Sequence, residues 1–221
     1  MIERALVAVG WAFVGALLGV VIRRGSVYLA RKEGLEPGFE RWQVWGPPLL
    51  NAILFAVFGV VIGLQPLLLI RSIWVAVLVQ VIFFDLEHRL ILDRVLFPAM
   101  ALAIVLSPFT PNLGWKLSLA TGFGAGLLFL VIAVAGAAIF KREALGFGDV
   151  KLAAFLGLIL GIAPTVPEPP IIEALFLGVL LAGAAGLAMM VLRIKALRDT
   201  FAYGPYLAAG AVLTLLILGA Q

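Results

Sequence analysis

Long apolar runs, separated by short polar patches, limit the folds open to this chain more than any other feature. Each run approaches the roughly 20 residues that a helix needs to cross the hydrocarbon core of a bilayer. Of the 221 residues, 64% are hydrophobic and 13% are charged, whereas soluble domains carry roughly 25% charged residues. A backbone inside a bilayer must satisfy its own hydrogen bonds, so these runs predict α-helices.

We therefore expect an all-α fold, a polytopic bundle of about eight transmembrane helices. Residues 1–221 would form a single membrane domain without a sizeable soluble part. The first run is followed by two arginines and has no clear cleavage-site pattern, which favours a mature helix over a signal peptide. The fourth run is short and holds Pro98, which favours a tilted or broken helix. The predicted helices lie near residues 5–22, 47–64, 66–84, 95–108, 115–140, 150–163, 171–192 and 203–219.

The basic residues gather in alternate loops, and this predicts the orientation of the chain. One set of loops holds 13 of the 16 basic residues, and the positive-inside rule places these loops in the cytoplasm and both termini outside. They are Arg23, Arg24, Arg31, Lys32, Arg41, Arg89, Arg94, Lys141, Arg142, Lys151, Arg193, Lys195 and Arg198, while Arg4, Arg71 and Lys116 belong to the opposite side.

The composition also limits the partners of the chain. There is no cysteine, and His88 is the single histidine, which excludes disulfides, thiolate metal sites and histidine-rich metal sites. We expect no bound metal. The net charge is +4, but the basic residues are spread among loops rather than gathered in a patch, so we expect anionic membrane lipid and no nucleic acid as a partner.

Two acidic clusters border apolar runs, at Asp85-Leu86-Glu87-His88 and at Gly146-Phe147-Gly148-Asp149-Val150-Lys151. Carboxylates next to lipid are costly and indicate a function. Two carboxylates that share a cavity hold one proton between them, so one acts as base toward water and the other as acid. We expect Asp85 and Asp149 to form this pair. Asp93 is the alternative partner, but in an uninterrupted helix it would lie about 12 Å along the axis from Asp85.

The other residues of these clusters have simpler interpretations. We expect Glu87, Asp93 and Glu143 to be solvated charges, alone or paired with Arg89 or Lys151, and His88 to lie among the lipid headgroups. Lys151 either lowers the pKa of a nearby carboxylate or anchors the chain at the headgroups, and we favour the anchor.

The glycines carry two further expectations. Gly146 and Gly148 would bend the backbone into conformations closed to other residues. The glycine-rich faces that hold Gly122, Gly124 and Gly126, or Gly183 and Gly186, are typical of close helix packing rather than of ligand binding.

Three segments in order resemble the type IV prepilin peptidases, which are intramembrane aspartic proteases of the GxGD class. Residues 84–93 resemble the family's first aspartate segment, although Leu92 stands where a proline is usual. Residues 146–152 match the second motif, and residues 203–208 resemble its late Phe-Gly-Pro stretch. The resemblance implies that Asp85 and Asp149 are catalytic. It implies that Asp93 is structural and that Gly146, Gly148 and Lys151 support the site.

The departures from the family lie toward the N-terminus. Many bacterial members carry a cytoplasmic insert with two Cys-x-x-Cys pairs that bind zinc, and they also methylate the cleaved pilin. Here residues 23–46 form a short loop without cysteine, and Asn51 replaces an acidic residue of the family. We expect a reduced N-terminal region over residues 1–64 and a peptidase core over residues 65–221. No cofactor is expected, except S-adenosylmethionine if methyltransferase activity is retained.

The resemblance implies a prepilin or pseudopilin substrate, cleaved at the cytoplasmic face of a prokaryotic inner membrane. Presenilin-like proteases need a Pro-Ala-Leu after GxGD, and none follows Asp149. The alternatives are a bifunctional peptidase and N-methyltransferase, a peptidase for another membrane-tethered precursor, or a non-enzymatic transporter or pilin-binding protein. Transporters also use broken helices and buried acids, but two repeated halves are not evident here.

Overall fold

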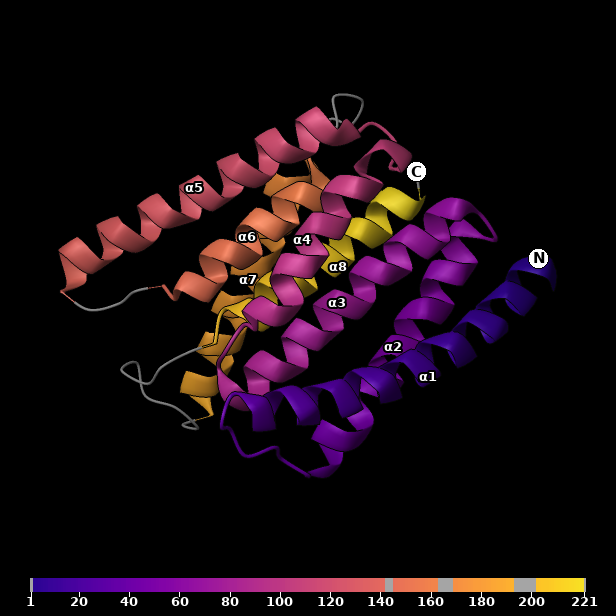
Figure 1. Cartoon of the computed structure of the whole chain (residues 1–221), viewed down its shortest axis with the longest axis horizontal. Coiled ribbons are helices and arrows are strands. Elements are labelled where there is room, and N and C mark those ends of the chain that lie inside the picture. The colour runs from indigo at the N-terminus through magenta and orange to yellow at the C-terminus, as the bar shows by residue number, and fades with distance from the viewer. Residues whose placement is uncertain (1, 142–144, 163–168, 193–201, 221) are drawn as a thin grey trace. The chain divides into compact units, whose positions relative to one another are not determined.

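The computed structural model describes residues 2–141, 145–162, 169–192 and 202–220. These residues form eight α-helices and one short 3-10 turn, and they contain no strand (Figure 1). The all-α prediction is confirmed, and each helix overlaps one of the predicted runs. The elements are α1 (Ile2–Lys32), α2 (Arg41–Ile62), α3 (Pro66–His88), α4 (Asp93–Leu106), η1 (Ser107–Phe109), α5 (Gly114–Phe140), α6 (Phe147–Leu160), α7 (Pro170–Val191) and α8 (Gly204–Ala220).

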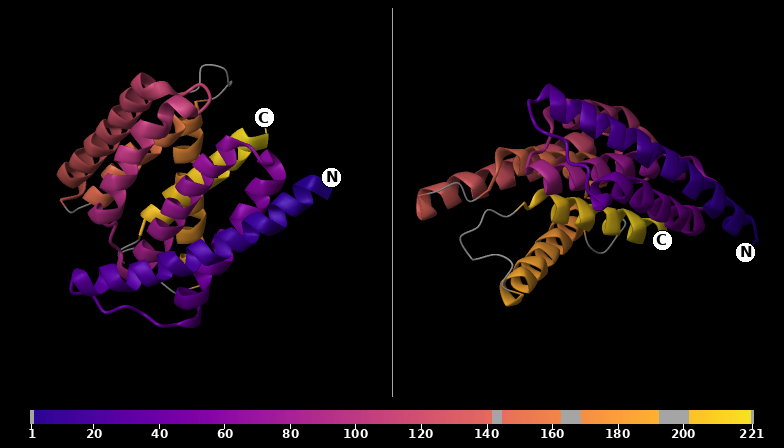
Figure 2. Two further views of the ribbon diagram at one scale, coloured as in Figure 1. Left: turned by 45° about the vertical axis from the view of Figure 1, so that its right-hand side comes forward. Right: turned by 90° about the horizontal axis from the view of Figure 1, so that it is seen from below.

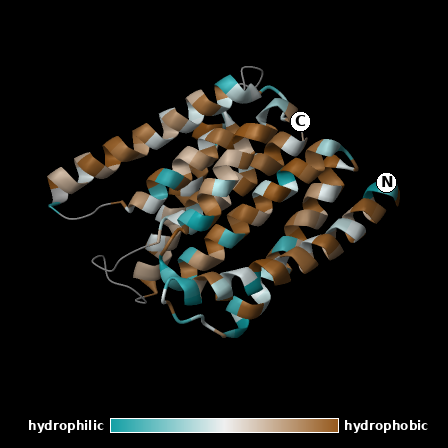
Figure 3. Cartoon of the chain, in the orientation of Figure 1, coloured by the Kyte–Doolittle hydropathy of each residue, from teal (hydrophilic) through white to brown (hydrophobic). Residues whose placement is uncertain are grey.

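Five of the helices, α1, α2, α3, α5 and α7, are long and apolar enough to cross a membrane. The other three are shorter, with 14 residues in α4, 14 in α6 and 17 in α8. Large apolar side chains such as Phe13, Ile53 and Phe123 are exposed, as lipid-facing residues are. Hydrophobic colours cover most of the helices in Figure 3, and hydrophilic ones gather in the segment that joins α1 to α2. The chain is a multi-pass membrane protein.

The chain divides into two compact units. The first holds residues 1–90 with 215–221, and the second holds residues 91–214. Within the first unit α1 packs along α2 and also against α3 (Figure 1). Two glycines of α1 allow this approach, because a Cβ at Gly15 would lie 2.8 Å from the Cβ of Phe55 and one at Gly19 would lie 2.6 Å from the carbonyl oxygen of Pro47.

Arg71 is a buried arginine within an apolar helix of the first unit. Arg71, in the second turn of α3, is 7% exposed. Its guanidinium donates to the carbonyl oxygens of Leu215 at 2.9 Å and Leu218 at 3.1 Å, near the end of α8. The last carbonyls of a helix have no partner within the helix and attract a cation. Arg71 therefore caps α8.

Glycines also set the packing of the second unit. A Cβ at Gly157 of α6 would lie 2.7 Å from the carbonyl carbon of Thr121 on α5. A Cβ at Gly178 of α7 would lie 2.8 Å from the Cα of Leu207 on α8, which α7 crosses in Figure 2. Of the predicted packing glycines, Gly122 and Gly126 do meet α6 at close range. The expectation is wrong for Gly124, Gly183 and Gly186, because no heavy atom of the described residues lies within 4 Å of a Cβ built on them.

The fourth predicted run forms a continuous helix. α4 runs through Pro98 to Leu106 and is followed directly by η1. The prediction of a break was wrong. Pro98 is the sixth residue of α4, so the one hydrogen bond that it cannot donate would go to the first turn of the helix, where a lost bond disrupts less than in mid-helix.

The close approach of α5 and α6 predicts opposite effects for two glycine substitutions. Gly157→Ala should destabilise the protein by about 1–3 kcal/mol, because its methyl group would overlap the backbone of Thr121. Gly124→Ala, on the open side of α5, should be neutral or stabilise by up to about 1 kcal/mol through helix propensity. Thermal unfolding in detergent measures both effects. Equal midpoints for the two variants would contradict this packing.

Candidate active site

Asp85 lies in the last turn of α3 and is 5% exposed. The helix ends at His88, and Arg89 adopts a left-handed conformation with φ of 53°. The backbone N–H of Arg89 donates to the carbonyl oxygen of Asp85 at 2.8 Å. Asp85 is thus a buried acidic residue in the last turn of α3, and its own carbonyl oxygen accepts the hydrogen bond that ends the helix.

The two residues that follow Leu86 are held inside the first unit. The Glu87 side chain is 4% exposed and accepts a hydrogen bond from Arg23 Nη1 at 2.8 Å. The backbone N–H of Gly38 donates to the other Glu87 oxygen. His88 Nε2 lies 3.4 Å from Glu87 Oε1, and its ring centroid lies 4.7 Å from that of Phe84.

The prediction of a solvated Glu87 was therefore wrong, whereas the placement of His88 among the lipid headgroups stays a prediction. The cause is the length of α1. The first apolar run was expected to end at residue 22, but the helix continues to Lys32. Arg23 thus lies in mid-helix and reaches α3. Sequence reasoning missed Arg23 as a partner, although the apolar residues at 27–30 were the signal that the helix continues.

Asp149 lies in the first turn of α6 and is 8% exposed. Gly146 is the N-cap, with φ of −71° and ψ of 147°, and Gly148 is helical. Neither glycine has a positive φ. The prediction that they bend the backbone into conformations closed to other residues was therefore wrong. The reason is that α6 begins at Phe147 rather than at residue 150. Gly148 is instead a point of contact, since a Cβ there would lie 3.1 Å from the Cβ of Ile91.

The surroundings of Asp149 disfavour its charged form. Burial raises the pKa of the Asp149 carboxyl from its ordinary value of 3.8 to about 6. A hydrogen bond with the backbone of Gly146 acts in the opposite direction, as does the N-terminal position of Asp149 in α6. Desolvation is the larger effect, so Asp149 is suited to hold a proton near neutral pH.

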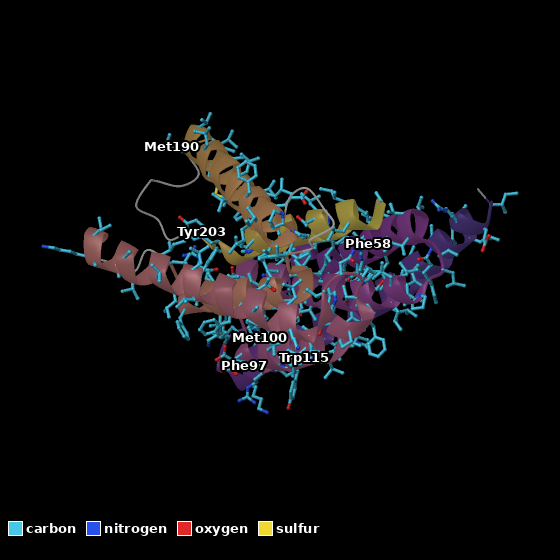
Figure 4. All side chains as sticks on the ribbon, turned by 90° about the horizontal axis from the view of Figure 1, so that it is seen from above. Phe58, Phe97, Met100, Trp115, Met190 and Tyr203 are labelled. Atoms are coloured by element: carbon cyan, nitrogen blue, oxygen red, sulfur yellow. The ribbon has the colours of Figure 1, made fainter. Side chains whose placement is uncertain are left out.

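Lys151 is paired with Asp93 within the second unit. Its ammonium donates to the two Asp93 oxygens at 2.6 and 2.8 Å. It also lies over the rings of Phe147 and Phe97, with 4.9 and 5.5 Å to the centroids, and Figure 4 labels Phe97 on α4. Lys151 thus forms an ion pair that joins the start of α4 to the start of the second turn of α6, while its role as a headgroup anchor stays a prediction. The Asp93 side chain is half exposed.

The remaining predicted residues are placed as follows. Tyr203, labelled in Figure 4, precedes α8, and its carbonyl oxygen accepts from the backbone N–H groups of Tyr206 and Leu207 at 3.1 Å each. Glu143 lies outside the described residues, as do Arg142, Arg193, Lys195 and Arg198 of the charged loops. In the described part of the chain, no group of three acidic, histidine or cysteine side chains could hold a metal ion.

Of the predicted site residues, the structure brings together Asp93 and Lys151. Asp85 belongs to the first unit and Asp149 to the second, so their pairing stays a prediction. The separation expected between Asp85 and Asp93 assumed an uninterrupted helix. This condition is not met, because α3 ends at His88 and α4 begins at Asp93.

The chain is thus a multi-pass helical membrane protein with two buried aspartates, each in the terminal turn of a helix. The chain belongs to the type IV leader peptidase family. The model of this family matches residues 72–191, which are more than half of the chain. The matched segment includes Asp85, Asp93, Asp149 and Lys151.

The chain is also similar to the prepilin leader peptidase/N-methyltransferase of Bacillus subtilis (strain 168). The two are 30% identical over 171 residues, which are 76% of this chain and 63% of the relative. The chain thus spans less than two thirds of the length of that protein. No solved structure matches the chain significantly.

The raised pKa of Asp149 predicts a pH-dependent stability. The folded state holds this proton up to about pH 6 and the unfolded state only to about pH 4, so the folded state loses stability as the pH rises through this window. The amide introduced by Asp149→Asn cannot ionise. The thermal midpoint of Asp149→Asn, relative to wild type, should therefore be higher at pH 8 than at pH 5. The same difference at both pH values would contradict the raised pKa.

Proposed function

We propose that this protein is an intramembrane aspartic endopeptidase that removes the leader peptide of type IV prepilins or pseudopilins. One observation carries the proposal: both predicted catalytic aspartates, Asp85 and Asp149, are buried in terminal turns of helices, within the segment that matches a leader peptidase family. The name of the Bacillus subtilis relative supports prepilins as the substrate class.

The proposed chemistry needs the two carboxylates and one water. Asp85, as base, takes a proton from the water while the water oxygen bonds to the carbonyl carbon of the scissile peptide. Asp149, as acid, gives its proton to the leaving nitrogen as the C–N bond breaks. The raised pKa of Asp149 supports its assignment as the acid. Because water and the pair supply every atom and proton, hydrolysis requires no cofactor.

Asp93 and Lys151 would support this site without reacting. Lys151 follows Asp149 by two residues, so the two side chains point about 200° apart around α6. Asp93 holds the ammonium with both of its oxygens. We assign to this pair the role of keeping the Lys151 charge on α4 and away from Asp149, in agreement with the structural role that the resemblance implies for Asp93.

Cleavage of a prepilin in membranes tests the assignment. Asp85→Asn and Asp149→Asn should each lower the rate at least about 100-fold, because each removes one half of an acid–base pair. Asp93→Asn should retain most of the activity. A gel shift and the mass of the new N-terminus provide the readout. Equal cleavage by all variants would show that these aspartates are not the catalytic pair, and no cleavage by wild type would favour a transporter or a non-enzymatic pilin-binding protein instead.

The same product masses test a second activity. The relative from Bacillus subtilis is named as an N-methyltransferase as well as a peptidase, which favours methylation of the new N-terminus with S-adenosylmethionine as the methyl donor. One extra methyl group on the product, present only when S-adenosylmethionine is added, would establish it.

We further propose that the protein lies in the prokaryotic inner membrane with its site toward the cytoplasm, as the charge distribution predicts. Because the chain has no cysteine, single cysteines report the topology without background. Glu36 and Gln65 are exposed and lie on either side of α2. An impermeant maleimide on intact cells should label Gln65→Cys and spare Glu36→Cys. The reverse pattern would place the site outside.

A further inference from the structure

Two charged side chains, Arg23 on α1 and Glu87 in the last turn of α3, hold both polar backbone groups of one loop residue. The N–H of Gly38 donates to Glu87 Oε1, and the carbonyl oxygen of Gly38 accepts from Arg23 Nη2. The ring closes where Arg23 Nη1 donates to Glu87 Oε2 at 2.8 Å. Three parts of the first unit therefore meet here: α1, the segment 33–40 and the last turn of α3.

The pair is buried, with the side chains of Arg23 and Glu87 at 10% and 4% exposure. Removing two charges from water is costly, and their mutual attraction compensates only when the remaining polar atoms also have partners. Both Glu87 oxygens and two Arg23 nitrogens are engaged here. Such an arrangement is better suited to fixing a geometry than to adding stability.

The segment is held at a second point as well. The backbone N–H of Glu40 donates to Gln43 Oε1 at 2.8 Å, at the start of α2. A Cβ at Gly38 would overlap the Gln43 side-chain amide, so a glycine is required there unless that amide moves. The course of the segment is therefore set by named contacts on both sides of Gly38.

The hydrogen-bonded ring of Arg23, Gly38 and Glu87 includes a residue that follows Asp85 by two positions on α3. Residues two apart on a helix point about 200° apart around its axis. Holding Glu87 against α1 thus fixes the rotation of the last turn of α3 and directs Asp85 to the side away from α1. The contact between the Phe84 and His88 side chains, whose ring planes are tilted by 53°, acts on the same turn. A terminal turn without such contacts is the part of a helix most prone to fray.

We propose that Arg23 and Glu87 form a latch, through Gly38, that holds the segment 33–40 against the last turn of α3 and so positions Asp85 for cleavage. The cleavage part of this proposal rests on the proposed function. Arg23 and Glu87 are positioning residues, because they act through Asp85 and do not touch the reacting atoms.

The holding of the segment is tested without reference to activity. A spin label on Glu36→Cys, the single cysteine of the chain, reports the mobility of the segment in lipid vesicles. Adding Glu87→Gln or Arg23→Gln should raise this mobility, because each substitution breaks the ring. Arg23→Lys keeps the charge but lacks the fork that reaches two acceptors, and its effect should be intermediate.

The positioning of Asp85 is tested by kinetics on a prepilin. A displaced catalytic group lowers turnover more than binding, so Glu87→Gln and Arg23→Gln should lower kcat about 10- to 100-fold and change KM by less than about twofold. The double variant should be no worse than the single ones, because the two residues act as a unit.

Another hydrogen bond between α1 and α3 provides a matched control. Trp11 Nε1 on α1 donates to Ser72 Oγ on α3 at 2.7 Å, and Ser72 lies about 20 Å along the helix axis from Asp85. Trp11→Phe should lower the thermal midpoint and leave both kcat and label mobility unchanged. If Trp11→Phe lowers kcat as much as Glu87→Gln does, the effect is general destabilisation and the latch is overturned.

The remaining outcomes separate the two proposals. Unchanged label mobility in Glu87→Gln overturns the latch, whatever the activity. Raised mobility with a wild-type kcat overturns the positioning of Asp85, while inactivity of Asp85→Asn keeps the proposed function in place. If wild type does not cleave, the proposed function and the positioning of Asp85 both fail, and label mobility alone decides whether the latch holds the segment.

Discussion

A charge surrounded by apolar helices must be satisfied by other groups of the protein, and this constraint accounts for three contacts that connect distant parts of the chain. In the first unit Arg71 caps the carbonyls of α8, and Arg23 is paired with Glu87. In the second unit Lys151 is paired with Asp93. Each of these contacts joins elements that are distant in the sequence, so a side chain that would be costly in lipid becomes a connection between helices.

Asp149 differs from these residues in how its burial is compensated. Its charge is opposed by desolvation, and the backbone contact with Gly146 only partly offsets this effect. Lys151, the nearest cation in the sequence, is held on Asp93 instead. A carboxyl group kept in this way can hold a proton at a pH where an ordinary aspartate has lost it, and that is the property that a general acid requires.

The apolar runs predicted the number of helices and their approximate positions, because the length of a membrane helix is set by the bilayer rather than by tertiary contacts. Helix ends were less predictable. Arg23 and Arg24 indicated a stop, yet α1 continues for another two turns because a buried acid on α3 satisfies Arg23. The early start of α6 likewise removed the predicted bend at Gly146 and Gly148. Such contacts depend on which helices meet, and a single sequence does not show this.

The family resemblance places a zinc-binding insert where this chain has only a short segment. A metal bound by four residues of one insert would fix that insert within itself. The ring of Arg23, Gly38 and Glu87 instead connects the segment to α1 and to the last turn of α3. The position of the segment and the rotation of the turn that carries Asp85 are therefore set by the same contacts. A chain without cysteine can in this way couple its loop directly to the helix that carries Asp85, because the groups that bind the loop are charged side chains of the helices themselves.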